Sequence, residues 1–517
     1  MTAEKHIMPD GDYGPAGHFD PVRFTRSASR SHRRRHVRVR DVLVDLYTAA
    51  LAAALAAVLA GSLMVYFREQ LLLAAAAPGR TLADQRWLVL PQDLVLYGAS
   101  TAALAAVAVL ARRLGPVSIA RAEGHWWLPL PLKRRPMVVR GILGRTLLTA
   151  GGGALLQLAV SFTARPGPGY PWTADRLAGA AAFGLAAAVM LLLAALRQTS
   201  RSGRSRPASG LMLPAAAVLA LLPEAAAAGY RWSPALAAAA AASLWLLLRN
   251  RLEHIPGAEL VRGGAVSGHA GAAVYFMDVN ELSRALAAPG KPSAAVRGRK
   301  FFHRPGAGPF AALLRADLVA FLRLPGVWVL PAASLLVCAV VILLEGGLPV
   351  YAQLAVIAAA GCASSSAVGA VARQTALLAG VDRLLPLPPA AVRGSRMLAP
   401  ALAMAAWLAL LGAGLSAVGA ADPAIAGLGA AAGAGLGAAA VRGGYRQAPD
   451  WSVLPVDTPF GPVPSAQLGD LGRGLDTAFL ALFPFLLAVF LGPSPALMVA
   501  QAAATACAVL VTLLSRR

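Results

Sequence analysis

The feature that most constrains this chain is a series of apolar segments, each about as long as a membrane-spanning helix. Such a helix needs about 20 mostly apolar residues to cross the hydrocarbon core of a bilayer. Of the 517 residues, 57% are hydrophobic and only 14% are charged, whereas a soluble domain carries about a quarter charged residues. A chain this apolar has too few polar side chains to cover a surface in water. We therefore predict an all-α, polytopic transmembrane helix bundle.

The apolar segments number about twelve and divide into two six-span halves. We expect residues 1–40 to form a basic cytoplasmic tail, 41–250 the first half, 251–308 a cytoplasmic linker, and 309–517 the second half. The predicted spans are Val42–Tyr66, Asp93–Leu110, Ile142–Phe162, Leu177–Leu196, Ser209–Ala228, Ser233–Leu248, Val327–Leu344, Ala352–Ala372, Met397–Val418, Ala424–Val441, Thr477–Leu491 and Ala496–Leu514.

The formal net charge is +23, from 47 Lys and Arg against 24 Asp and Glu. A nucleic-acid-binding protein gathers basic residues on one soluble surface, whereas a membrane protein places them in cytoplasmic loops beside anionic lipid. Here the basic segments alternate with the spans. This pattern predicts no nucleic-acid partner, an anionic inner leaflet as the lipid contact, and a multi-pass protein of the cell (plasma) membrane with both termini cytoplasmic. The predicted inner segments are Arg112–Arg140, Arg197–Arg206, Arg249–Arg323, Arg373–Arg396 and Arg442–Arg473.

An internal repeat places the same short pattern in each half. Leu128-Pro129-Leu130-Pro131 precedes Val139-Arg140-Gly141, which opens the third predicted span. Leu385-Pro386-Leu387-Pro388 and Val392-Arg393-Gly394 occupy the corresponding positions in the second half. Because proline fixes φ and donates no backbone hydrogen bond, alternating prolines end a helix and hold a stiff turn.

A stiff, basic turn just below the membrane can transmit force from a cytoplasmic partner, and this is our hypothesis for both copies. The alternative is an ordinary proline-rich loop. Two copies of the pattern at equivalent positions favour the coupling hypothesis over that alternative. The predicted coupling residues are Pro129, Pro131, Arg134, Arg135, Pro386, Pro388 and Arg393.

Residues Pro309–Leu324 have apolar side chains at helical spacing, with Arg315, Asp317 and Arg323 expected on the other face. This pattern predicts an amphipathic helix in the inner membrane interface, ended by Pro325-Gly326.

An interfacial helix, two spans, a basic proline turn and further spans together resemble the permease of ABC-2-type exporters. More narrowly, the chain resembles an uncharacterised actinobacterial family of permease-like membrane proteins, and its Ala, Gly and Arg bias agrees with a GC-rich source. The resemblance implies a separately encoded ATP-binding cassette ATPase as partner. It differs from common permeases in placing two six-span halves in one chain. The residues that carry it are Arg315–Pro325, Asp382–Arg396, Val274–Leu286 and Pro455–Asp476.

Sequence motifs for catalysis are absent from the chain. It contains no GxxxxGK[ST] phosphate loop, no HExxH and no GxSxG. Its three cysteines, Cys338, Cys362 and Cys507, stand inside apolar runs without metal-ligand spacing. Ionisable residues, which usually serve ion-coupled carriers, are nearly missing from the span interiors. We therefore expect no enzyme activity, cofactor or metal, and an energy source outside the chain.

Other interpretations remain open at this stage. The chain fits a non-transporting membrane scaffold or assembly protein, and less well an intramembrane lipid-modifying enzyme, which would need carboxylates or His pairs. The connection Tyr445–Asp476 is either an ATPase-docking surface or a long loop. The run Gly427–Gly435 favours tight helix contact over a substrate path. A homodimer is a further expectation for the partners of this chain.

Overall fold

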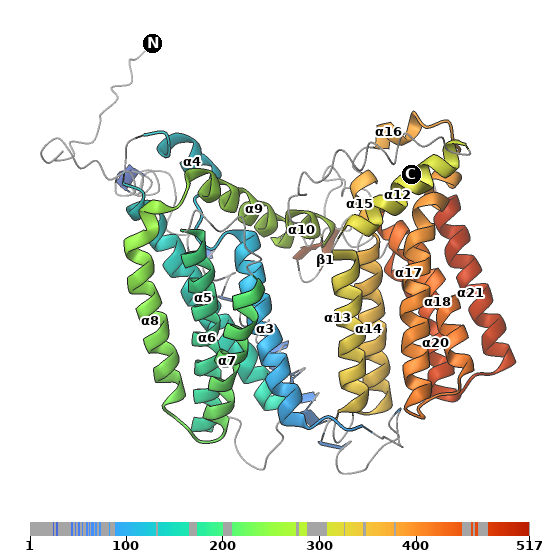
Figure 1. Cartoon of the computed structure of the whole chain (residues 1–517), viewed down its shortest axis with the longest axis horizontal. Coiled ribbons are helices and arrows are strands. Elements are labelled where there is room, and N and C mark those ends of the chain that lie inside the picture. The colour runs from blue at the N-terminus through green and yellow to red at the C-terminus, as the bar shows by residue number, and fades with distance from the viewer. Residues whose placement is uncertain are drawn as a thin grey trace, which may run out of the picture. The chain divides into compact units, whose positions relative to one another are not determined.

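The described part of the computed structural model consists of helices and one small hairpin, and the chain divides into two compact units (Figure 1). Unit 1 comprises Met1–Gln70 and Leu96–Ala288, and unit 2 comprises Leu71–Val95 and Pro289–Arg517. The structure describes residues 88–515, with gaps at 131–132, 165–172, 200–208, 276–278, 287–307, 325, 345–347, 377–378, 447–455, 459–460 and 464–473, and scattered residues between 24 and 82. Most of the predicted tail 1–40, most of the span Val42–Tyr66 and Pro131 lie outside the described residues.

Unit 1 is a helical bundle centred on α6, which contacts α5, α7 and α8. Small residues allow α5 and α6 to pack closely. A Cβ on Gly184 of α6 would lie 2.3 Å from the carbonyl oxygen of Ala150 in α5, so only glycine fits at this position. The elements of this unit are α3 Gln92–Leu114, α4 Arg121–Trp127, α5 Arg135–Ala164, α6 Ala174–Gln198, α7 Ser209–Ala227, α8 Ser233–Arg251, η2 Leu252–His254, α9 Gly257–Tyr275 and α10 Val279–Ala285.

The expected linker 251–308 is not simply a loop, because its first part forms η2, α9 and α10. Helix α9 lies across one end of the unit 1 bundle and packs against α4 (Figure 1). The Ile119 amide donates to the Leu260 carbonyl at 3.2 Å. A Cβ on Gly264 would lie only 1.7 Å from the Ile119 oxygen. Hydropathy missed this contact because it depends on glycines that bring two backbones together.

Unit 2 is a second bundle, centred on α18, which contacts α14, α17, α20 and α21 (Figure 1). Strands β1 and β2 form an antiparallel hairpin in which Val456 pairs with Val463. The elements of this unit are α12 Pro309–Arg323, α13 Gly326–Leu343, α14 Val350–Val368, α15 Ala370–Ala376, α16 Ala379–Arg383, α17 Pro389–Ala417, α18 Ala424–Gly444, β1 Val456–Thr458, β2 Gly461–Val463, α20 Leu475–Leu491 and α21 Pro495–Leu514.

The segment Leu71–Val95 belongs to unit 2, although it precedes most of unit 1 in the sequence. The Leu82 amide donates to Oε1 of buried Gln353 in α14 at 3.0 Å. The Leu90 amide donates to the Leu343 carbonyl at the end of α13 at 2.8 Å. These hydrogen bonds hold the connection before α3 against α13 and α14.

Eight described helices, α3, α5, α6, α13, α14, α17, α18 and α21, are long and apolar enough to cross a membrane. Shorter apolar helices occupy Met212–Ala226 and Leu475–Leu491, where two further spans were predicted. Helix α8 covers the predicted span Ser233–Leu248 but is not among these ten. The chain is thus a multi-pass membrane protein of helical class.

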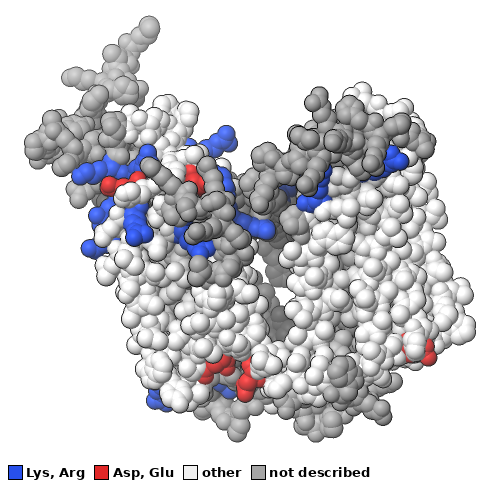
Figure 2. Space-filling view, in the orientation of Figure 1, with Lys and Arg blue, Asp and Glu red and all other residues white. Residues whose placement is uncertain are grey.

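Charged side chains are distributed unevenly along the bundle of each unit (Figure 2). In unit 2, arginines gather where α12, α15, α16 and the N-terminus of α17 meet, which we call the basic end. At its opposite end, the described part of the α17–α18 connection carries Asp422 and no Lys or Arg. In unit 1, arginines end α3, α6 and α8 and begin α4 and α5.

Candidate coupling site

The second proline turn ends a short helix and precedes a long one, as its prolines predict. Pro388 is the N-cap of α17 with φ −65° and ψ 150°, and Pro389 begins the helix. The Leu387 amide donates to the Leu385 carbonyl at 2.8 Å, which closes a tight bend. Leu384 is 83% exposed, and Pro386 and Pro388 are exposed as well. The turn therefore presents an apolar outer surface at the basic end.

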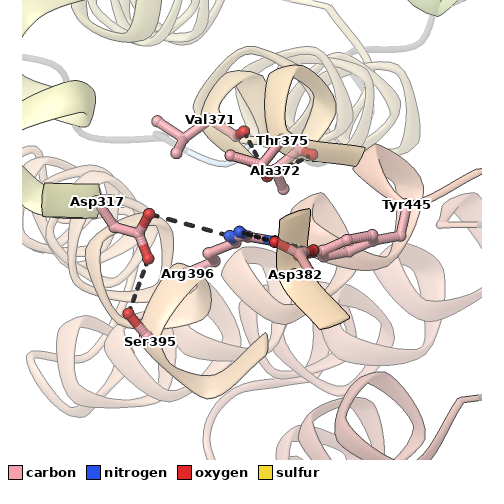
Figure 3. A network of polar contacts seen from close by, with 8 residues as sticks. All are labelled: Asp317, Val371, Ala372, Thr375, Asp382, Ser395, Arg396 and Tyr445. Atoms are coloured by element: carbon pink, nitrogen blue, oxygen red, sulfur yellow. Dashed lines mark hydrogen bonds and ion pairs between the residues drawn. The ribbon is translucent and has the colours of Figure 1, made fainter. Parts of the chain in front are cut away.

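A buried ion pair ties this turn to the long helix that follows it (Figure 3). The guanidinium of Arg396, on α17, donates to both carboxylate oxygens of Asp382, on α16, at 2.8 and 2.6 Å. Only 4% of the Arg396 side chain and 11% of the Asp382 side chain are exposed. Two parallel hydrogen bonds to a carboxylate fix the orientation of both groups as well as their distance.

Asp317 of α12 joins the same network from the other side (Figure 3). Ser395 Oγ donates to Asp317 Oδ2 at 2.8 Å, and Arg396 Nε lies 3.9 Å from Asp317 Oδ1, too far for a hydrogen bond. Burial raises the pKa of Asp317, although the hydrogen bond from Ser395 and the charge of Arg396 lower it. The expectation that Asp317 faces away from the apolar side was wrong, since it is 7% exposed and turned toward α17.

Tyr445, the C-cap of α18, completes the network. Arg396 donates a hydrogen bond to its hydroxyl group. Thr375 on α15 lies nearby, but its hydroxyl donates to the carbonyls of its own helix (Figure 3). One arginine thus connects α12, α16, α17 and the end of α18. We call Asp317, Asp382, Ser395, Arg396 and Tyr445 the Arg396 network.

Arg393, one of the predicted coupling residues, has an internal structural contact. It is 8% exposed and donates to the carbonyls of Leu513 and Ser515 at the end of α21. These carbonyls have no partner within the helix, so Arg393 satisfies the C-terminus of α21. Its guanidinium is therefore occupied inside unit 2, whereas Pro386 and Pro388 are exposed.

The first proline turn has a similar position and different contacts. Short helix α4 precedes Pro129, and α5 begins at Arg135, so a short helix, a proline turn and a long helix recur in both units. Arg134 is half-buried and donates to the Ile255 carbonyl at 3.0 Å, while Arg135 is exposed. Trp126 is 72% exposed and Leu130 is 47% exposed. This turn is attached to Ile255, which lies between η2 and α9, rather than to a buried carboxylate.

The connection Tyr445–Asp476 is anchored where it can be described. Asp476 lies 2.9 Å from Arg442 Nη2, and its Oδ1 accepts from the amides of Gly474 and Thr477. Gly474 has φ +94°, and a Cβ there would lie 2.8 Å from Gly443 Cα. Both ends of the connection therefore pack against α18, and most of its centre lies outside the described residues.

Residues 90–453 match a protein family of unknown function, DUF6297. The chain belongs to this family. The matched region of this DUF6297 protein contains both proline turns and the whole Arg396 network, and it ends before β1. No curated protein and no solved structure matches the chain. Among the described residues, no three His, Cys, Asp or Glu side chains are grouped as a metal site would need.

Proposed function

We propose that the chain is the transmembrane permease subunit of an ABC-type exporter, energised by a separately encoded ATPase. The supporting observation is that the second proline turn has an exposed apolar outer surface and, directly behind it, the buried Asp382–Arg396 ion pair. A push on the outer surface would reach α17 through that pair and α12 through Asp317. This is the arrangement that a force-transmitting turn requires.

The proposal places about twelve spans in two six-span halves, with the basic ends and both termini in the cytoplasm. Helix α17 has 29 residues and is about 43 Å long, whereas the hydrocarbon core is about 30 Å thick. We place the excess of about 13 Å, or about two turns, at the N-terminal end of the helix, in the headgroup region. The Arg396 network would then lie at the inner interface, where α12 rests beside the anionic leaflet.

Cysteine labelling tests the orientation. In a chain whose three native cysteines are replaced by alanine, Leu384→Cys at the basic end should react only after the membrane is opened. Tyr230→Cys, 56% exposed in the α7–α8 connection, should react with a membrane-impermeant maleimide in intact cells. Because both side chains are well exposed, a difference in their rates of maleimide labelling shows on which side of the membrane each one lies. Labelling of Leu384→Cys from outside would reverse the proposed orientation.

The coupling proposal predicts that Pro386→Ala/Pro388→Ala weakens association with the ATPase about tenfold. Each proline restrains the free backbone by about 0.4–1 kcal/mol, so two prolines together account for about one order of magnitude in affinity. Membrane insertion should be unchanged, because both side chains are exposed and outside the apolar segments. Two measurements test this: the amount of ATPase that co-purifies with the tagged protein from native membranes, and the rate of ATP-dependent export.

A matched control is Pro495→Ala, which changes an exposed proline that begins α21 at the opposite end of unit 2. It should bind the ATPase like the unchanged chain. If the turn variant and the control behave alike, the turn does not couple to an ATPase. If no ATPase accompanies even the unchanged chain, the non-transporting scaffold becomes the better proposal.

A further inference from the structure

A shallow groove of about 600 Å³ follows the C-terminal half of α21. We propose that it holds an acyl chain of an anionic phospholipid whose phosphate binds Arg442. This inference goes beyond transport and rests only on insertion of the chain in a bilayer. The groove is lined by Ala503, Ala506, Cys507, Leu510, Val511 and Leu514, with Arg442 and Ser515 at one end.

The length and surroundings of the groove suit an acyl chain. From Ala503 to Leu514 the helix rises about 16 Å, which is about half of the 30 Å hydrocarbon core. Helix α21 is a candidate span of which only 17% is buried. Its open face would therefore be in contact with one leaflet of the bilayer. The small side chains of Ala503, Ala506 and Cys507 leave space along that face for a chain.

The charge at the end of the groove suits a phosphate. Arg442 ends α18 at the basic end of unit 2, and 22% of its side chain is exposed. Its Nη2 lies 2.9 Å from Asp476 Oδ2, and the Asp476 side chain is 49% exposed. A guanidinium has five N–H donors, so this pair leaves donors for phosphate oxygens. An arginine at the end of an apolar groove matches the two parts of an anionic lipid.

A second copy of the chain is the other candidate occupant, because small residues also let helices approach. A two-fold axis along the membrane normal would place both copies of Arg442 at the same depth, with like charges near one another. Burial of Arg442 at such an interface would also remove the water that solvates its half-exposed partner Asp476. The charge at the groove end therefore favours a lipid.

The experiment is native mass spectrometry of the full chain in detergent, titrated with phosphatidylglycerol or with phosphatidylcholine of the same acyl chains. We expect the unchanged chain to retain phosphatidylglycerol at least tenfold more tightly. Arg442→Gln should reduce that preference about tenfold. Ala506→Trp, at an exposed position, should fill the groove and weaken both lipids. The control Arg383→Gln removes an exposed charge from the same end, outside the groove, and should change neither.

Asp476→Asn provides a test with the opposite sign. Asparagine keeps the Oδ1 acceptor used by Gly474 and Thr477 and removes the charge that competes for Arg442. Phosphatidylglycerol affinity should therefore rise several-fold, which a misfolded variant could not produce. The lipid proposal is overturned if Arg442→Gln and Asp476→Asn both retain the lipid like the unchanged chain. It is also overturned if Ala506→Trp removes a dimer rather than a lipid. Carbonate extraction reports whether each variant is inserted in the membrane. A variant that is inserted but does not bind lipid counts against the lipid proposal alone, because none of these measurements involves transport or an ATPase.

Discussion

Arg396→Gln is expected to destabilise unit 2 by about 3–5 kcal/mol, the usual cost of removing one partner of a buried ion pair. The change leaves Asp382 and Asp317 in a site where their side chains are only 11% and 9% exposed, without the cation between them. It also removes the hydrogen bond to Tyr445, and with it the link to α18. For a unit of this size, the melting temperature in detergent should fall by roughly 10 °C.

The two carboxylates should differ when each is made neutral. Asp382→Asn replaces one of the two oxygens that accept from Arg396 with an NH2 group and removes the negative charge, so at most one weaker hydrogen bond remains. Asp317→Asn should cost clearly less, because burial raises the pKa of Asp317 and its ionised form is already less favourable there. Arg383→Gln, an exposed change on α16, should alter stability by no more than about 0.5 kcal/mol. If the Arg396→Gln variant has the same melting temperature as the unchanged chain, the Arg396 network does not stabilise unit 2.

The positions of most spans could be predicted from hydropathy, because a bilayer-crossing helix needs a long apolar run wherever it occurs. Helix boundaries were harder. The span predicted from Met397 belongs to α17, which begins at Pro389. Hydropathy excluded this first part because it contains Arg393 and Arg396. Both arginines are nevertheless buried, since the ends of other helices supply carbonyl and carboxylate acceptors.

The candidate site was predicted only in its outer part. The repeated proline pattern located the turns, since proline acts on its own backbone and needs no partner. Asp317, Asp382 and Tyr445 could not be assigned as partners of one arginine, because they lie on three elements far apart in the sequence. One signal was available: Asp317 is the only acidic residue in the amphipathic segment Pro309–Leu324, and a carboxylate that becomes buried usually has a cation nearby.

Gly433→Ala is expected to disrupt unit 2 although it adds only one methyl group. A Cβ at Gly433 of α18 would lie 2.2 Å from the Met404 carbonyl oxygen and 2.5 Å from Ala405 Cα, both in α17. These atoms belong to backbone, so the two helices must separate. On α18, Gly429 and Gly437 meet α17 backbone in the same way, at 2.6 and 2.3 Å. The small-residue run predicted to serve helix contact does so here.

Gly427→Ala is the matched control, because no atom lies within 4 Å of its added Cβ on the same helix. In a helix, alanine is favoured over glycine by about 1 kcal/mol, so the control should be neutral or slightly stabilising. Gly433→Ala has the same gain in helix propensity, but overpacking against α17 should lower its free energy of unfolding by more than this gain. The measurement is the folded fraction by size-exclusion chromatography in mild detergent, with the melting temperature of what remains. If both variants are equally stable, α17 and α18 are not in backbone contact at Gly433, and their close association in unit 2 would need another explanation.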